Sequence, residues 1–103
     1  MQFDSFMDYE TLEDWVDRFV DDHGEIARAE VIAESAKGRA VKAVHLTNSA
    51  FPDSDKEVAL IIIGRHGNEI GTRVVGPAVL SWLASDAAKE ILDRQHVIVI
   101  PVA

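Results

Sequence analysis

The residues best able to do chemistry together lie in one short stretch, residues 64–69, with the sequence Gly-Arg-His-Gly-Asn-Glu. It offers an imidazole at His66 and a carboxylate at Glu69, three residues further on. At the start of a helix, that separation lets both side chains converge on one point, as metal ligation requires. An imidazole nitrogen and a carboxylate oxygen are a normal pair of zinc ligands. The spacing therefore indicates a candidate Zn2+ site at His66 and Glu69.

A second interpretation of the same two residues stays open at this point. A histidine and a glutamate can stand at a helix start without any metal. Glu69 would then interact favourably with the helix dipole, and His66 would form its hydrogen bonds within the loop. Two protein ligands are also one fewer than a catalytic zinc site normally has. The secondary structure expected on either side of the loop bears on which of the two interpretations holds.

An apolar run without alternation, residues 58–63, leads into the loop. Such a run predicts a strand buried on both faces, in the interior of a sheet covered by helices. After the loop, a helical pattern begins near residue 70, and Gly76-Pro77 marks either a kink or a late helix start. A short helix at about 86–94 and a buried strand at 96–102 follow. The apolar residues expected to face inward on the first of these helices are Val74, Val75, Ala78, Val79, Trp82 and Leu83.

The chain before this run predicts a helix, a hairpin and a surface loop. Residues 9–23 carry apolar side chains at three- and four-residue spacing, as an amphipathic helix does. Two short strands, 29–35 and 40–46, flank a turn in which Gly38 can adopt a positive φ. The polar segment 47–57 has the composition of a surface loop. The apolar stripe of the helix consists of Leu12, Trp15, Val16, Phe19 and Val20.

The order of these elements favours an α/β fold. Residues 58–102 have the length and pattern of a strand, a helical crossover and a parallel strand. A sheet with helices on both faces is the natural class for such a chain. In open α/β sheets, ligands gather beyond the carboxyl ends of the strands, and residues 64–69 occupy that place.

From Tyr9 onward, the chain resembles the zinc metallocarboxypeptidases, the carboxypeptidase A-like zinc exopeptidases. Four segments carry the resemblance in the family's order: the helix start at 9–12, the hairpin at 34–46, the strand and loop at 58–69, and the terminal strand ending at 100–103. The loop Arg-His-Gly-Asn-Glu is similar to the one that delivers the family's His-x-x-Glu zinc ligands. The resemblance covers nearly the whole chain.

The resemblance implies a fold, a domain and an activity. Residues 1–103 would be the amino-terminal part of a single catalytic domain, a truncated piece of a mixed, mostly parallel sheet flanked by helices. The strands would lie in the order 1-2-4-3, which leaves the strand at 58–63 as an exposed edge. His66 and Glu69 would bind zinc, while the third ligand and the general base lie further along in the family. The implied activity is zinc-dependent hydrolysis of peptide bonds, and we expect the 103-residue chain alone to be inactive.

The residue between the two ligands keeps a related activity open. Digestive-type members of the family carry arginine there, whereas this chain carries Asn68. The segment His-Gly-Asn-Glu looks more like bacterial and acyl-amino-acid-cleaving branches, so an acyl-amino-acid deacylase is an alternative. The substrate would then be an N-acyl amino acid instead of a peptide. A non-enzymatic binding domain that keeps the fold is the third alternative.

The other histidines do not complete a zinc site at this loop. His96 begins its strand, so we expect it about 20 Å from the strand's carboxyl end at 3.3 Å per residue. His45 lies on the hairpin and His23 at a helix end. We expect both to be surface or partly packed histidines.

Composition excludes several function classes. The net charge is -8 and acids cluster between residues 4 and 25, so nucleic acid is not an expected partner. No apolar run approaches the roughly 20 residues that cross a bilayer, so we expect no membrane association. Cysteine is absent, which rules out disulfides and thiolate ligands. Residues 1–10 contain three acids and no basic residue, unlike a signal peptide, so we expect a cytoplasmic location.

Overall fold

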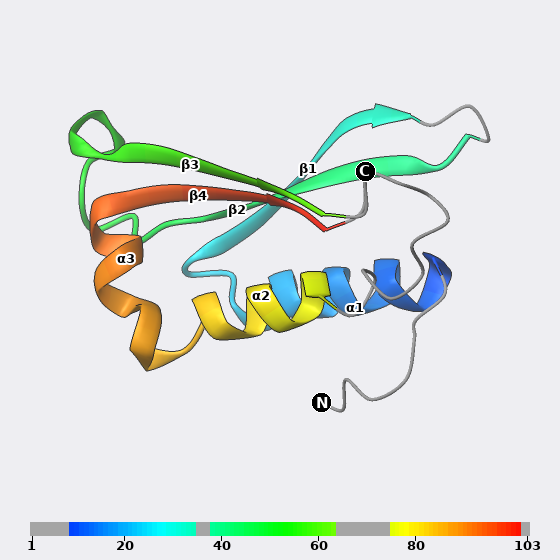
Figure 1. Cartoon of the computed structure of the whole chain (residues 1–103), viewed down its shortest axis with the longest axis horizontal. Helices are drawn as coiled ribbons and strands as arrows, with labels where there is room; N and C mark the ends of the chain where they lie inside the picture. Colours follow the sequence, from blue (N-terminus) through cyan, green and yellow to red (C-terminus); the bar gives the residue numbers. More distant parts are fainter. Residues whose placement is uncertain (1–8, 35–37, 64–74, 102–103) are drawn as a thin grey trace.

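The computed structural model describes residues 9–34, 38–63 and 75–101. Its order of helix, hairpin, strand, helices and strand is the one that the sequence predicts (Figure 1). The elements are α1 (Tyr9–Asp22), β1 (Ala27–Glu34), β2 (Ala40–Leu46), η1 (Asp53–Asp55), β3 (Glu57–Ile62), α2 (Val75–Leu83), η3 (Asp86–Ala88), α3 (Lys89–Arg94) and β4 (Gln95–Ile100). None of these helices combines the length and the apolar character that a membrane-spanning segment needs.

The four strands form one mixed sheet in the order β1-β2-β4-β3, which confirms the expected strand order. β3 and β4 run parallel, with Val58 opposite His96, so the predicted crossover connection is present. β1 pairs antiparallel with β2, and β2 pairs antiparallel with β4. Among the described strands, one pairing is parallel and two are antiparallel, because a single crossover connection joins parallel neighbours.

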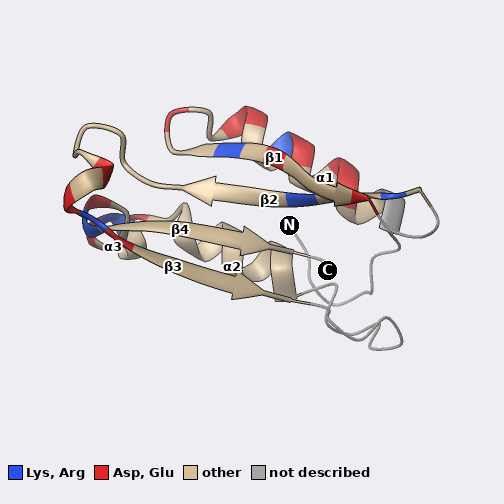
Figure 2. Cartoon of the chain, turned by 90° about the horizontal axis from the view of Figure 1, so that it is seen from above, with Lys and Arg blue, Asp and Glu red and all other residues tan. Residues whose placement is uncertain are grey.

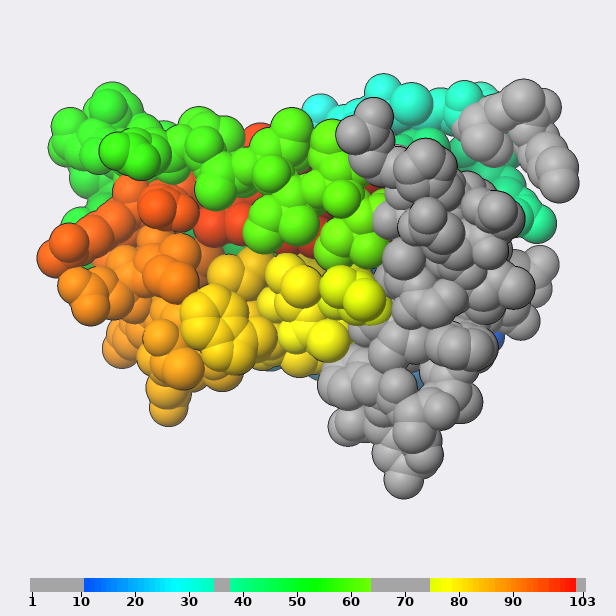
Figure 3. Space-filling view, viewed as in Figure 1, coloured from blue at the N-terminus to red at the C-terminus, as the bar shows by residue number. Residues whose placement is uncertain are grey.

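All three α-helices lie on the same face of this sheet (Figure 1). The expectation of helices on both faces is wrong for the described residues, where no helix lies on the opposite face. β3 shows the difference most clearly, since Val58 is 66% exposed and Leu60 57% exposed, while Ala59 and Ile61 pack against the core. The apolar run of β3 was expected to be buried on both faces, and here it is buried on one. Figure 3, which looks onto the edge formed by β3 (green), shows its side chains at the surface.

The core lies between the sheet and the helices. From α1, Leu12, Val16 and Phe19 are buried, and Trp15 and Val20 pack against them, which confirms the predicted apolar stripe. Asp14, Asp17, Asp21 and Asp22 of α1 are exposed, and Figure 2 shows acids (red) along this helix. The remaining buried apolar residues of this cluster are Ala27, Val44, Leu46, Ile63, Leu80, Leu83, Ala88, Leu92, Val97 and Val99.

The buried face of α2 differs from the prediction. Val75, Ala78 and Trp82 are exposed, although all three were expected to face inward. Leu83 is buried as expected, and Leu80, which was not expected to face inward, is buried together with Gly76 and Pro77 at the start of the helix. α2 is apolar nearly all round, so its periodicity did not reveal which side meets the core. Val74, the other residue placed inward at the start of the pattern, lies outside the described residues.

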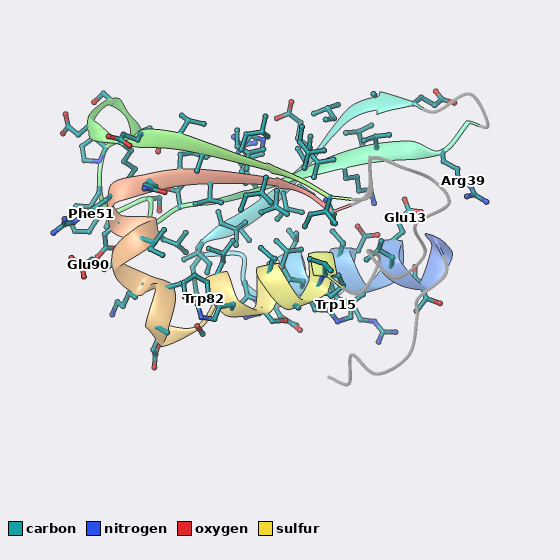
Figure 4. All side chains as sticks on the ribbon, viewed as in Figure 1. Glu13, Trp15, Arg39, Phe51, Trp82 and Glu90 are labelled. Atoms are coloured by element: carbon teal, nitrogen blue, oxygen red, sulfur yellow. The ribbon has the colours of Figure 1, made fainter. Side chains whose placement is uncertain are left out.

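The hairpin and its attachment to α1 position the first two strands. Gly38 in the turn has a φ of 80°, which confirms the expected use of a positive φ. Lys42 of β2 lies over α1, where its Nζ is 2.8 Å from Oδ1 of Asp17 and 3.2 Å from Oε1 of Glu13. Figure 4 shows Glu13 rising from α1 toward the sheet. Burial alone would lower the pKa of Lys42, but the hydrogen bonds and charges of the two carboxylates outweigh it and raise that pKa above 10.5.

Candidate functional site

The carboxyl ends of β3 and β4 meet at one edge of the sheet, because the two strands are parallel. The pairing continues one residue past β3, where the backbone N–H of Ile63 donates to the carbonyl oxygen of Ile100 at 3.0 Å. Ile63 is also part of the buried core. The chain therefore leaves the sheet at this edge from a fixed point, and residues 64–74 begin there.

The far end of the segment 64–74 is attached at the same edge. α2 begins at Val75, and Gly76 packs against Pro101, the residue that follows β4. A Cβ atom added at Gly76 would lie 3.0 Å from the Cβ atom of Pro101, so a larger residue would crowd this contact. The described residues that flank the segment thus lie beside the carboxyl ends of the parallel pair, where α/β folds gather their ligands.

The two predicted zinc ligands belong to this segment and lie outside the described residues. His66 follows Ile63 by three residues and Glu69 by six. Their role as ligands stays a prediction. Within the part of the chain that the structure describes, no group of three or more His, Asp or Glu side chains is arranged to hold a metal ion.

The described histidines lie away from this edge. His96 is opposite Val58 at the amino ends of the parallel strands, four residues before Ile100. At about 3.3 Å per residue, it is roughly 13 Å from the end of β4, nearer than the expected 20 Å because the strand ends earlier. His23 donates from Nδ1 to the carbonyl oxygen of Phe19 at 2.9 Å and is half-buried, as expected of a partly packed histidine.

Sequence reasoning missed one contact between histidines. The Nδ1 atom of His45 and the Nε2 atom of His96 are 2.8 Å apart, although the residues are 51 positions apart in the chain. No local pattern links them. Only the register between β2 and β4, in which His45 lies opposite Ile98, brings the two rings together.

Comparison with known proteins identifies the family of this chain. The model of the zinc carboxypeptidase family matches residues 12–103. The chain belongs to the zinc carboxypeptidase family.

Among curated proteins, carboxypeptidase B of Helicoverpa zea is 24% identical over 107 residues, which cover 99% of this chain and 24% of the relative. The chain thus spans about a quarter of that relative's length.

Solved structures have the same fold at low sequence identity. Carboxypeptidase A from Helicoverpa armigera superposes with a TM-score of 0.88 at 19% identity, over 99% of this chain and 25% of that one. Bovine thrombin-activatable fibrinolysis inhibitor, in complex with a tick carboxypeptidase inhibitor, gives a TM-score of 0.81 at 12% identity, over 97% and 31%. These likenesses confirm an α/β sheet flanked by helices.

Proposed function

We propose that this chain is the amino-terminal part of a zinc-dependent hydrolase of peptide bonds, in which His66 and Glu69 are two of the zinc ligands. The observation that carries the proposal is that the described residues on both sides of the segment 64–74 contact the same edge of the sheet. Ile63 is held there by the carbonyl oxygen of Ile100, and Gly76 by Pro101. Membership of the zinc carboxypeptidase family supports the same assignment.

The donor types fit the metal. An imidazole and a carboxylate are ordinary zinc ligands, and zinc, when bound, polarises a carbonyl and makes water more acidic. The described residues on either side of the segment lie at the carboxyl end of the parallel pair, through the backbone bond of Ile63 and the contact of Gly76.

The 103-residue chain alone is expected to have no hydrolase activity. Two protein ligands are one fewer than catalytic zinc sites normally use, and the family's general base lies further along the chain. Peptides with a free carboxyl terminus are the proposed substrates of the longer protein. Zinc-dependent turnover by the purified chain, abolished by His66→Ala, would contradict the expected inactivity.

Zinc titration of the purified, metal-free chain tests the ligand assignment. We expect weak binding that falls at least about tenfold in His66→Ala and in Glu69→Ala, since loss of a second-shell partner alone costs 10–100-fold. His23→Ala is the matched control, because His23 is bonded to Phe19 at the end of α1 and lies away from the segment's attachment points. Zinc affinity unchanged in both ligand variants would refute the assignment.

A substrate panel tests the reaction in a longer protein that contains this chain. Cleavage of a blocked dipeptide with a free carboxyl terminus, and loss of that cleavage in His66→Ala, are the expected results. Cleavage confined to N-acyl amino acids would favour the deacylase. If neither substrate is cleaved while zinc still binds, the non-enzymatic alternative gains support.

A further inference from the structure

The helix-free face of the sheet carries a pair of histidines that the proposed function does not use. Val44 and Leu46 of β2 are buried in the core, so His45 between them points to the other face. His96 points to the same face, since its neighbour Val97 is buried. The Nδ1 atom of His45 and the Nε2 atom of His96 are 2.8 Å apart, which is the distance of a hydrogen bond between the two rings.

This hydrogen bond joins two strands whose backbone pairing is short. β2 and β4 pair over three residues, 44–46 opposite 97–99, which we call the β2–β4 junction. β1 and β2 pair over seven residues, and β3 and β4 over six. Among the described strands, the β2–β4 junction is therefore the shortest pairing, and it connects the β1–β2 hairpin to the parallel pair. A side-chain contact at this junction has few backbone pairings beside it.

Each ring also contacts a carboxylate through its outer nitrogen. The Nε2 atom of His45 is 3.1 Å from Oε2 of Glu30 in β1. The Nδ1 atom of His96 is 3.2 Å from Oδ2 of Asp53 in η1.

Two cations stand behind these carboxylates. Arg28 of β1 lies 3.7 Å from Glu30, and Lys56, which follows η1, lies 3.9 Å from Asp53. β3 presents the uncharged Val58 at this position of the sheet. The structure thus surrounds the pair of rings with two carboxylates and two cations.

The contacts specify how many protons the pair holds. An ionised carboxylate only accepts hydrogen bonds, so each outer nitrogen needs a proton, and the bond between the inner nitrogens needs a third. With two protons, either the two inner lone pairs face each other or one outer lone pair faces a carboxylate. With four, two N–H groups face each other across 2.8 Å. Three protons, which give the pair one positive charge, satisfy every contact.

We propose that His45 and His96 form a pH-sensitive switch at the β2–β4 junction, closed while the pair holds three protons and open once a fourth has bound. The fourth proton comes from solvent and takes the lone pair that accepted the hydrogen bond between the rings. It also places a second positive charge beside the first. The rings then move apart, and the three residue pairs of the junction loosen with them.

Burial and charge at the pair support this order of events. Burial, followed by the charge of Arg28, lowers the pKa of His45 below 6.5, and the charge of His96 adds to this effect. The hydrogen bond and the charge of Glu30 act in the opposite direction without reversing the shift. The side chains of His45 and His96 are 12% and 14% exposed, so protons from solvent reach the rings, while water hydrates a second charge only in part.

The switch is separate from the proposed zinc site. His96 lies at the amino end of β4, whereas the backbone bond between Ile63 and Ile100 lies at its carboxyl end. The inference therefore stands whether or not His66 and Glu69 bind zinc.

Amide hydrogen exchange of the 103-residue chain between about pH 7.5 and pH 5 tests the proposal. Corrected for the intrinsic effect of pH on exchange, opening at residues 44–46 and 97–99 should rise by up to about tenfold per pH unit below 6.5. The rise should end at the lower pKa of His45 in the folded chain. The amide of Ile63, bonded at the other end of β4, should respond less.

Two variants remove the titrating ring and keep a hydrogen-bonding group in its place. His45→Asn puts an amide near the position of Nδ1, and His96→Gln puts one near the position of Nε2. An amide donates or accepts at any pH in this range, so both variants should lose the rise in exchange. His23→Asn is the matched control and should keep the rise, because His23 is bonded to Phe19 at the end of α1.

A titration of the wild-type rings removes any dependence on how the variants fold. The 15N shifts of the imidazole nitrogens should show the fourth proton binding below pH 6.5, in the range in which exchange at the junction rises. A fourth proton that binds at pH 6.5 or above would overturn the proposal, as would junction exchange that stays constant through the titration. The same rise in His45→Asn and His96→Gln, or an equal rise at Ile63, would overturn it as well.

Discussion

Replacing Gly76 by alanine should destabilise the protein through one contact. The added Cβ atom would lie 3.0 Å from Cβ, 3.2 Å from the carbonyl oxygen and 3.3 Å from Cα of Pro101. Optimal carbon contacts are about 3.5–4.0 Å, so α2 and Pro101 must separate by roughly 0.5 Å. Pro101 is buried, and two of the three contacts are with backbone atoms, so no flexible side chain can relieve the crowding.

The size of the effect follows from two opposing terms. Overpacking in a well-packed region costs about 1–3 kcal/mol. Alanine is favoured over glycine inside a helix by up to about 1 kcal/mol, and Gly76 lies in the first turn of α2, where the gain is smaller. We therefore expect Gly76→Ala to lose about 1–2 kcal/mol of unfolding free energy. That loss lowers the Tm by roughly 4–16 °C in a domain of this size.

Thermal unfolding followed by far-UV circular dichroism measures this loss. Gly24→Ala is the matched control, because its added Cβ would meet only two backbone oxygens, Val20 O at 3.9 Å and Asp21 O at 4.0 Å. Its stability should stay within about 0.5 kcal/mol of the wild type. If Gly76→Ala is as stable as Gly24→Ala, Pro101 moves without cost and the start of α2 is not packed tightly against it.

Three further predictions concern the remaining contacts. Lys42→Met should lose about 1 kcal/mol of unfolding free energy. A double-mutant cycle with Asp17→Asn should show that the ion pair between Lys42 and Asp17 accounts for a large part of this loss. The pKa of His45 is lower in the folded chain than its ordinary 6.5, so the folded state binds fewer protons than the unfolded state. The contribution of His45 to stability is therefore present above pH 6.5 and is lost as the pH falls through the lower pKa of the folded chain. Urea unfolding across this pH range should show the unfolding free energy rising with pH, and His45→Asn should make that rise smaller. Leu60→Lys should reduce self-association measured by light scattering, since Leu60 is 57% exposed on an edge strand. If the variant associates as the wild type does, β3 is not the surface through which the chains contact one another.

The sequence predicted those parts of the fold whose patterns are local and strong. The apolar stripe of α1 repeats over about two and a half turns, and acidic residues stand between its members, so its buried side could be assigned correctly. The hairpin was predictable because Gly38 marks the turn between two strands. The strand order came from the family resemblance, since propensity alone does not specify which strands pair.

Other features depend on tertiary contacts that local patterns do not contain. α2 is apolar on nearly every side, so only its packing through Leu80 and Leu83 reveals the buried face. The exposure of Val58 and Leu60 depends on what covers the second face of the sheet. The contact between His45 and His96 depends on a register set between distant strands, which no short motif specifies.

The position of β4 in the sheet has a consequence for synthesis on the ribosome. β4 is the last strand in the sequence, yet it lies between β2 and β3 and pairs with both. Ile62 pairs with Ile100, about 40 residues later, so at about 5–20 residues per second β3 waits roughly 2–8 s for its partner. During that delay the β1–β2 hairpin can already form, while the apolar side chains of β3 have no strand beside them. The nascent chain therefore carries an unpaired apolar strand until residue 100 has left the exit tunnel.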